Sequence, residues 1–511
     1  MILAVAGATL SLTFVATSAW WLALLLVALL VWRLNAATPR RAAWLAWCFG
    51  CAWLCAGTWW LYISMHRYGA LPAGLAALAV FVLAAALSGY LALAAALYAH
   101  WRRGHVAADA ALFAALWLLA ELARGAIFTG FPWVASGYAW VDAPLALLAP
   151  WTGVYGLGAV LAFSAAWLAG LTTKTPAQRL TLGAPVMLAL SLPVQFGPWP
   201  FTQPSGTLSV TLLQSNVAQD EKFAAQRMPE ALQWAAQTMS ASRADLVLAP
   251  ETIIPLLPEQ LEQFVPGYWA ALRARFVNSS QAALVGVPLG DFDRGYSNSV
   301  VGLSRSAAPD YRYDKVHLVP FGEFIPTGFR WFTELMNIPL GDFSRGVLDA
   351  PSFVVRGERV APNICYEDLF GEELAVRFAD DKTAPTMMAN VSNIAWFGDT
   401  IAIAQHLNIS RMRALEFQRP MLRATNTGAT ALIDHRGRVT AQLTPQTRGV
   451  LDGSVQGRTG LTPFAWWASR WGLWPLWGLA MLTVLLLVAT RHAPKASIPR
   501  LHSDSAGPDR L

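Results

Sequence analysis

The chain is poor in charged residues. Of its 511 residues, only 13% are Asp, Glu, Lys or Arg, whereas 55% are hydrophobic. Soluble domains carry about a quarter of charged residues, so this shortage excludes a chain that faces water along its whole length. Much of the protein surface must face lipid. The 24 tryptophans agree with this interpretation, because the indole ring favours the membrane–water interface.

Cysteine is also scarce, with four residues in all. Cys48, Cys51 and Cys55 share one apolar segment and fall on roughly one helix face. Metal or redox work would need a second ligand pair and polar neighbours, so packing is the better interpretation of these three. Cys365 stands alone without an obvious disulfide partner. In an oxidising compartment, a lone thiol is a liability unless the protein uses it.

The sequence lacks a metal-ligand cluster and a phosphate-binding glycine loop, so we expect no cofactor and no metal. The net charge is +6 and the isoelectric point about 9.2, a balance that could indicate nucleic acid. The Lys and Arg residues are, however, scattered or placed beside apolar segments. They are better explained as charges that set membrane topology, and no nucleic-acid partner is expected.

Seven apolar segments approach or exceed the length of about 20 residues that spans hydrocarbon. They lie at roughly 2–32, 42–64, 72–98, 107–126, 151–171, 178–196 and 471–490. The first is too long for one untilted span and could be two short helices with a break near Thr17-Ser18, which would make about eight transmembrane helices. Its first basic residue is Arg33, so a cleaved signal peptide is not expected.

Basic residues fall on every second connection between these segments. They are Arg33, Arg40 and Arg41, then Arg102 and Arg103, then Lys174 and Arg179, and finally Arg491, Lys495 and Arg500. The positive-inside rule places all of them in the cytoplasm and the large domain on the outer side. The predicted organisation is transmembrane helices at 1–198, an outer domain at 199–468, a last transmembrane helix at 469–492 and a disordered cytoplasmic tail at 493–511.

The pattern changes between 200 and 465, where short β-rich runs alternate with helical patterns. The predicted strands are 208–213, 245–249, 283–287, 298–303, 360–365, 386–391 and 429–434; the predicted helices are 230–243, 260–277 and 406–419. Asp434-His435-Arg436-Gly437 is typical of a hairpin turn. Such alternation favours an α/β domain.

Three residues at strand ends could carry covalent acyl chemistry. Glu251 follows the strand-like run 246–249, where α/β folds build their sites, and could take the proton that a thiol must lose to become a nucleophile. Lys315 follows an extended run, and a fixed cation there can stabilise an oxyanion. Cys365 ends the run 360–364. Taken singly, each has an ordinary explanation: a salt-bridged loop glutamate, a surface lysine and an inert buried thiol.

The order glutamate, lysine, cysteine, each at a strand end, resembles the nitrilase superfamily of carbon–nitrogen hydrolases. The whole chain resembles the apolipoprotein N-acyltransferase family. The segments that carry this resemblance are Thr129 to Trp133, Lys315 to Glu323 with Phe324 and Pro326, Phe343 to Gly346, Ile364 to Glu367, Ser392-Asn393 with Ala395 to Gly398, Arg411 to Glu416 and Gly460 to Pro463. The resemblance implies an αββα sandwich beside a helical membrane bundle, in the inner membrane of a bacterium with the sandwich in the periplasm.

It also implies a ping-pong acyl transfer. Glu251 would take the thiol proton, and Cys365 would take an acyl chain from a phospholipid, typically the sn-1 chain of phosphatidylethanolamine. Lys315, with a backbone N–H after Cys365, would hold the oxyanion. The acceptor would be the α-amine of the diacylglyceryl cysteine of an apolipoprotein. By matching position, Glu323, Tyr366 and Glu367 would support the site. Three aromatic residues would contact substrate: Phe223, Trp133 and Trp396.

Apolar loops around 321–331 and 395–397 could act as lids that exclude water from the thioester. Two alternatives stay open from the residues alone. In the first, water resolves the thioester and the protein is a membrane-anchored amidase or hydrolase. In the second, the outer domain is degenerate and serves a transporter or assembly factor.

Overall fold

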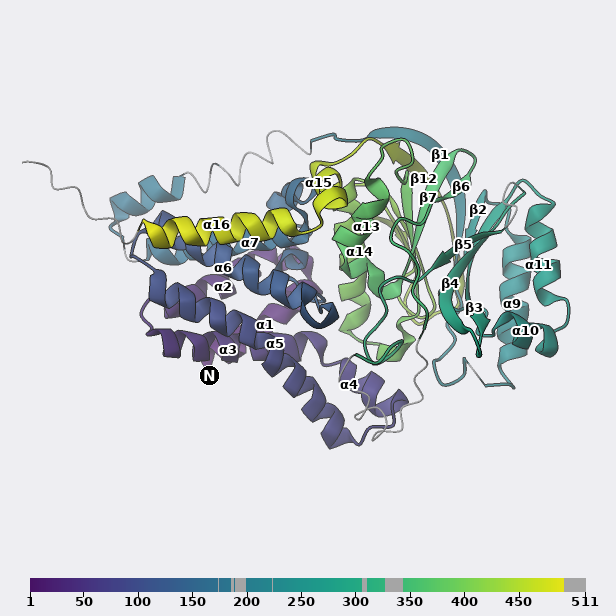
Figure 1. Ribbon diagram of the computed structural model, residues 1–511, viewed down its shortest axis with the longest axis horizontal. Helices are drawn as coiled ribbons and strands as arrows, with labels where there is room; N and C mark the ends of the chain where they lie inside the picture. Colours follow the sequence, from purple (N-terminus) through teal and green to yellow (C-terminus); the bar gives the residue numbers. More distant parts are fainter. Residues whose placement is uncertain are drawn as a thin grey trace, which may run out of the picture.

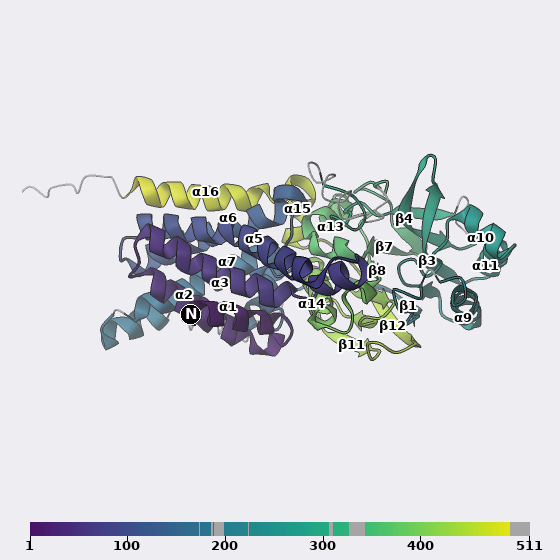
Figure 2. The same ribbon diagram turned by 90° about the horizontal axis from the view of Figure 1, so that it is seen from below.

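The computed structural model describes residues 1–172, 174–184, 188, 199–222, 224–305, 310–326 and 343–490. A bundle of helices forms one half of an elongated molecule, and an α/β domain forms the other half (Figures 1 and 2). The long bundle helices run roughly along the long axis of the molecule. The α/β domain therefore lies at one end of the bundle.

The bundle is built from the first 171 residues and one helix near the C-terminus. Its α-helices are α1 (Ile2–Leu10), α2 (Trp20–Leu34), α3 (Pro39–Thr58), α4 (Leu61–Ile63), α5 (Ala73–Trp101), α6 (Val106–Ala126), α7 (Ala149–Leu171) and α16 (Trp474–Ala489). Short 3₁₀ or π turns connect them: η1 (Ser11–Phe14), η2 (Thr17–Ala19), η3 (Ser64–Tyr68), η4 (Ile127–Thr129), η5 (Ser136–Trp140) and η6 (Pro144–Leu148). The first apolar segment is thus two helices, because Ala16 leaves helical geometry at ψ +74°.

Within the described residues, four helices are long and apolar enough to cross a membrane, and six if each of two bent pairs counts as one span. The bent pairs are Pro39–Thr58 with Leu61–Tyr68 and α15 (Pro463–Trp471) with α16. The first helix, Ile2–Phe14, is shorter than a span. The segment predicted at 178–196 falls mostly outside the described residues. The count of eight transmembrane helices therefore stays a prediction.

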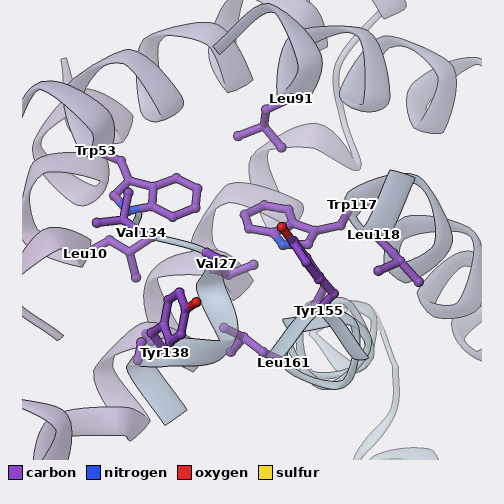
Figure 3. Packing of buried hydrophobic residues seen from close by; sticks show 14 of the residues in the cluster. Leu10, Val27, Trp53, Leu91, Trp117, Leu118, Val134, Tyr138, Tyr155 and Leu161 are labelled. Carbon is purple, nitrogen blue, oxygen red and sulfur yellow. The ribbon is translucent and has the colours of Figure 1, made fainter. Parts of the chain in front are cut away.

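The bundle core is packed with aromatic and aliphatic side chains. Figure 3 shows Trp53 and Trp117 near the centre, with Leu10 and Leu161 among the surrounding residues. The Trp53 and Trp117 rings are stacked, with centroids 6.0 Å apart. Offset or stacked aromatic pairs add about 0.5–1.5 kcal/mol to what burial alone contributes. Tryptophan therefore serves the interior of this bundle as well as its surface.

The α/β domain contains two six-stranded mixed sheets. The first has the order β12-β1-β2-β3-β4-β5 and the second the order β11-β10-β9-β8-β7-β6. The strands of the first are β1 (Gln203–Gln214), β2 (Leu246–Leu248), β3 (Ala282–Asp291), β4 (Gly295–Leu303), β5 (Tyr311–Asp314) and β12 (Gly449–Thr459). Those of the second are β6 (Phe353–Val355), β7 (Glu358–Ile364), β8 (Met387–Ser392), β9 (Met421–Thr425), β10 (Ala431–Ile433) and β11 (Val439–Gln442).

Helices cover the outer faces of both sheets, so the layers are helix, sheet, sheet, helix. The helices on the first sheet are α9 (Met228–Ala241), α10 (Pro258–Phe264) and α11 (Tyr268–Val277). The second sheet carries α13 (Gly371–Ala375), α14 (Ile401–Phe417) and α15, with short 3₁₀ turns η7 (Cys365–Leu369), η8 (Val376–Phe378) and η9 (Ile394–Phe397). An apolar core of alternate strand residues fills the space between the sheets. The predicted αββα arrangement is thereby confirmed.

Two local predictions can be compared directly with these elements. The hairpin turn at 434–437 is confirmed: β10 and β11 are antiparallel, and Gly437 takes the left-handed φ of +70°. The prediction of a single helix at 260–277 is wrong. This segment is two helices, α10 and α11, because Pro266 and Gly267 interrupt it and Gly267 has φ +75°.

The helix α14 joins the domain to the bundle. Its residue Gln405 donates to the carbonyl of Gly57 at 3.0 Å and accepts from the indole N–H groups of Trp60 and Trp133. Asn408 donates to the carbonyl of Phe14 at 3.0 Å. Buried polar groups cost little only when they are paired, so these contacts fix the domain against the loops at one end of the bundle.

Candidate active site

Each of the three residues nominated from the sequence follows the carboxyl end of a strand. Glu251 comes three residues after β2, Lys315 directly after β5 and Cys365 directly after β7. The first two strands belong to one sheet and β7 to the other. Strand ends from the two facing sheets thus bring the three side chains into one site, although 114 residues separate the first from the last.

Glu251 is held by donors on both carboxylate oxygens. Its Oε1 accepts from Asn298 Nδ2 at 2.6 Å, and its Oε2 accepts from the backbone N–H of Asn393 at 2.7 Å. The ammonium of Lys315 lies 3.7 Å from Oε1. The two N–H donors hold the carboxylate in one orientation.

Lys315 is almost completely buried, with 1% of its side chain exposed, between two carboxylates. Its Nζ donates to Glu323 at 2.9 Å. Burial alone would lower the pKa of Lys315, but the charges of Glu323 and Glu251 outweigh it and raise that pKa above the ordinary lysine value. The side chain therefore stays a fixed cation. Glu323 is itself anchored by Asn298 Nδ2 and by the N–H of Val319.

Cys365 adopts φ +53°, in the left-handed region that non-glycine residues seldom occupy. Burial, and then the negative charge of Glu251, raise the pKa of its thiol well above that of free cysteine, and Lys315 offsets this only in part. At neutral pH the sulfur is thus a thiol. It becomes a nucleophile only if a base removes its proton. Glu251 is the negative group with the largest effect on the pKa of this thiol.

Hydrogen bonds to Glu367 hold the turn that carries Cys365 in place. That carboxylate accepts from the N–H groups of Ile364 and Val316 at 2.6 Å each and from the hydroxyl of Tyr313 at 2.9 Å. It therefore ties the end of β7 to the segment that carries Lys315. Tyr366, the next residue after the thiol, donates from its hydroxyl to the carbonyl of Gly130 at 3.2 Å. The turn is thereby fixed to a bundle loop as well.

Lys222 is a further charged group beside the site, and the sequence reasoning missed it. Its Nζ donates to the backbone carbonyl of Glu251 at 3.2 Å and to the hydroxyl of Thr252 at 2.5 Å. Burial lowers the pKa of Lys222 to about 8, against the opposing effect of the Glu251 charge. The side chain holds the backbone on which the candidate base is carried, where Thr252 has a left-handed φ of +45°.

The aromatic residues nominated as substrate contacts have different surroundings. Trp133 is 3% exposed, and its ring lies against Trp60 and Phe397 where the bundle meets the domain. Trp396 is 40% exposed, and its ring is edge-on to Tyr68 of the bundle at 5.5 Å. Phe223 lies outside the described residues, as do residues 327–331 of the predicted lid at 321–331. The roles of all three aromatics stay predictions.

Other polar residues around the site were not foreseen from the sequence. Asn298 bridges Glu251 and Glu323, and Asn390, His406 and Arg423 lie behind Cys365. A signal was present for two of them: Asn390 and Arg423 sit in short strands that are otherwise mostly apolar. A charged or amide side chain at such a buried position needs a specific partner. Within the part of the chain that the structure describes, no group of His, Cys, Asp and Glu is suited to holding a metal ion.

The arrangement suits acyl transfer through a thioester. It combines a thiol, a carboxylate placed to take its proton and a permanent cation for the oxyanion of a tetrahedral intermediate. The turn that carries the thiol packs against a loop of the bundle.

Comparison with known proteins was made for the whole chain. Residues 6–167 match the family model described as the apolipoprotein N-acyltransferase N-terminal domain, and residues 209–464 match the carbon-nitrogen hydrolase model. An apolipoprotein N-acyltransferase of Verminephrobacter eiseniae (strain EF01-2) is 53% identical over 479 residues, which cover 89% of each chain. One of Ralstonia nicotianae (strain ATCC BAA-1114 / GMI1000) is 45% identical over 507 residues, or 97% of this chain and 94% of the relative.

Proposed function

The chain belongs to the apolipoprotein N-acyltransferase family, and from that membership we propose the reaction, the catalytic residues and the location of this enzyme. It is an acyltransferase of the carbon–nitrogen hydrolase type. It transfers an acyl chain from a lipid to a lipoprotein acceptor. The donor is a membrane phospholipid, most simply phosphatidylethanolamine, and the acceptor is the α-amine of an S-diacylglyceryl cysteine at the N-terminus of an apolipoprotein.

In the first half-reaction, Glu251 takes the thiol proton and the sulfur of Cys365 attacks the ester carbonyl carbon of the phospholipid. The ammonium of Lys315 and the N–H of Tyr366 stabilise the oxyanion that forms. The bond between carbonyl carbon and glycerol oxygen then breaks, and the glycerol oxygen takes the proton back from Glu251. The products are a lysophospholipid and a thioester on Cys365.

In the second half-reaction, the acceptor amine attacks the thioester carbonyl. Its proton passes to Glu251, the carbon–sulfur bond breaks, and the thiolate regains that proton. The product is an amide on the acceptor cysteine. The observation that supports the proposal is the meeting of Glu251, Lys315 and Cys365 at the ends of three strands from the two sheets. The turn that carries Cys365 is bound to the membrane bundle.

We place the enzyme in the inner membrane, with the α/β domain in the periplasm. In Figure 1, α5, α7 and α16 all end on the side of the bundle away from the domain. Arg102 and Arg103 come directly after the end of α5, and Lys174 comes three residues after the end of α7. The positive-inside rule assigns that side to the cytoplasm and the domain to the opposite side.

The test is mass spectrometry of the purified protein after incubation with phosphatidylethanolamine vesicles. The proposal expects an acyl adduct on Cys365 and a lysophospholipid product, and no adduct in Cys365→Ala. A diacylated peptide with a free N-terminal amine should then remove the adduct and become N-acylated. Release of free fatty acid without an N-acylated peptide would instead support the hydrolase alternative. Full acyl transfer by Cys365→Ala would refute the assignment of the nucleophile.

A further inference from the structure

The backbone carbonyl of Cys365 is held by two buried side chains that no step of the proposed reaction uses. His406 on α14 approaches it with Nε2 at 3.1 Å, and Asn390 on β8 donates from Nδ2 at 3.3 Å. Both residues are fully buried. The left-handed φ of Cys365 is unfavourable for a non-glycine residue, so contacts that hold this peptide group have a structural reason to be there.

Arg423 on β9 sets the orientation of both side chains. Its Nη2 lies 2.8 Å from Nδ1 of His406, and its Nη1 donates to Oδ1 of Asn390 at 3.0 Å. A guanidinium can only donate. Nδ1 of His406 must therefore be the acceptor, which leaves the ring hydrogen on Nε2, facing the carbonyl of Cys365. By the same logic, Asn390 presents its NH₂ group to that carbonyl.

His406 stays neutral across the physiological range. Burial and the charge of Arg423 lower the pKa of His406 far below the ordinary histidine value. The charge of Arg423 is offset by Asp368, whose carboxylate lies 3.6 Å away. The Nε2–H donor is therefore present at any pH at which the enzyme works.

The carbonyl of Cys365 and the N–H of Tyr366 belong to one peptide group. That group is planar and trans, so its C=O and N–H point in opposite directions. Fixing the carbonyl fixes the direction of the N–H. Tyr366 lies in the first turn of η7, where an N–H has no acceptor within the helix. Donors on the carbonyl also polarise the peptide, which strengthens its N–H as a donor by about 10–30%.

We propose that His406 and Asn390, both oriented by Arg423, are positioning residues that aim and polarise the Cys365–Tyr366 peptide as the second oxyanion donor beside Lys315. This inference rests on the proposed function. It assigns to the buried cluster a task in the tetrahedral intermediate, beyond packing. His406 acts through the peptide and does not touch substrate.

The test compares two reactions of the same thiol in the full-length protein. Acylation by phosphatidylethanolamine vesicles passes through an oxyanion, whereas alkylation by iodoacetamide does not. His406→Phe keeps a ring in place but removes both hydrogen bonds. His406→Gln keeps an N–H donor at the position of Nε2. Asn408→Leu, which removes the buried hydrogen bond from α14 to the carbonyl of Phe14, is the matched control.

Loss of a direct oxyanion donor costs about 100- to 1000-fold in rate, so loss of a group that orients one should cost roughly 10- to 100-fold. We expect His406→Phe to slow formation of the acyl adduct by that factor and to leave alkylation of Cys365 within about twofold of the native rate. His406→Gln should recover most of the acylation rate, and Asn408→Leu should retain it.

Three results would overturn this inference alone: native acylation by His406→Phe, equal losses of acylation and alkylation in that variant, or a glutamine variant no better than phenylalanine. Absence of any adduct in the native protein would overturn the proposed function, and this inference with it.

Discussion

Replacing Glu251 by glutamine removes the candidate base with a minimal change of shape. Both carboxylate oxygens accept from N–H donors, namely Asn298 Nδ2 and the backbone of Asn393. A glutamine amide has a single oxygen, so its NH₂ group must face one of these donors. The substitution also removes one of the two negative charges beside Lys315. We expect the fold to survive, because Glu323 still neutralises the buried ammonium.

The expected loss of activity follows from the state of the thiol. The pKa of Cys365 is raised, and a thiol whose pKa exceeds about 9 is less than about 3% ionised at pH 7.5. A positioned general base accelerates such a step by about 10²- to 10⁴-fold, which corresponds to about 3–5 kcal/mol of activation free energy. Glu251→Gln also lacks the acid that returns a proton to the leaving lysophospholipid, so the upper part of that range is expected.

The assay is the rate at which the acyl adduct forms on Cys365, measured by mass spectrometry in phospholipid vesicles. The matched control is Glu358→Gln. Glu358 is also buried and accepts from a backbone N–H and a hydroxyl, but it joins β7 to β1 away from the thiol. The control should acylate at close to the native rate. Adduct formation by Glu251→Gln within tenfold of the native rate would refute the role of Glu251 as the base.

Two further predictions concern pH. The charge of Glu251 contributes to the raised pKa of the Cys365 thiol. The rate at which iodoacetamide alkylates the native enzyme should therefore still be rising at pH 9, and Glu251→Gln should shift this pH profile to lower pH. An unchanged or higher midpoint in the variant would contradict this electrostatic account. For Lys222, whose pKa burial lowers to about 8, the unfolded chain binds more protons than the native protein between pH 8 and about 10.5. The free energy of unfolding of the native protein should therefore rise with pH across that window, by up to about 3 kcal/mol relative to Lys222→Met. The measurement is the melting temperature of both proteins in detergent from pH 7 to 10. Parallel melting temperatures would count against a buried lysine that loses its charge.

The hydrophobic pattern of short segments predicted those helices and strands that depend on such a pattern. Long apolar runs indicated the bundle helices, and alternating short runs indicated the α/β domain. Strand β9 and the last strand β12 were not foreseen. β9 carries a buried arginine, which hides it from a search for apolar runs, and β12 is half-exposed and rich in polar residues. Its place at the edge of the first sheet comes from antiparallel pairing with β1, at the opposite end of the domain sequence.

The candidate site divides in the same way. Glu251, Lys315 and Cys365 could be nominated because each follows a strand, and their order resembles a known superfamily. The residues that hold them could not be nominated individually. Asn298 reaches Glu251 because β4 lies beside β3, and Lys222 reaches the same residue from a loop that follows β1. Such contacts depend on strand order and register, which no single segment contains.

Trp133 illustrates the limit from the other direction. The family resemblance implied that this residue contacts substrate, and that role stays a prediction. In the structure its indole N–H donates a hydrogen bond to Gln405 of α14, and the centroid of its ring lies 5.4 Å from that of His406. A side chain with an apolar face and one hydrogen-bond donor is equally suited to contacting substrate and to packing between the bundle and the domain. Composition alone therefore could not distinguish these two roles.

The sequence by itself determined which segments are apolar enough to enter lipid, which part is an α/β domain and which three residues could carry acyl chemistry, because hydrophobic periodicity and strand-end position are properties of short segments. Only the tertiary structure decided that the carbonyl of Cys365 faces His406 and Asn390, and that the thiol turn rests on the bundle. Those relations come from packing two sheets and a helix from distant parts of the chain, where buried polar groups can be paired in few ways.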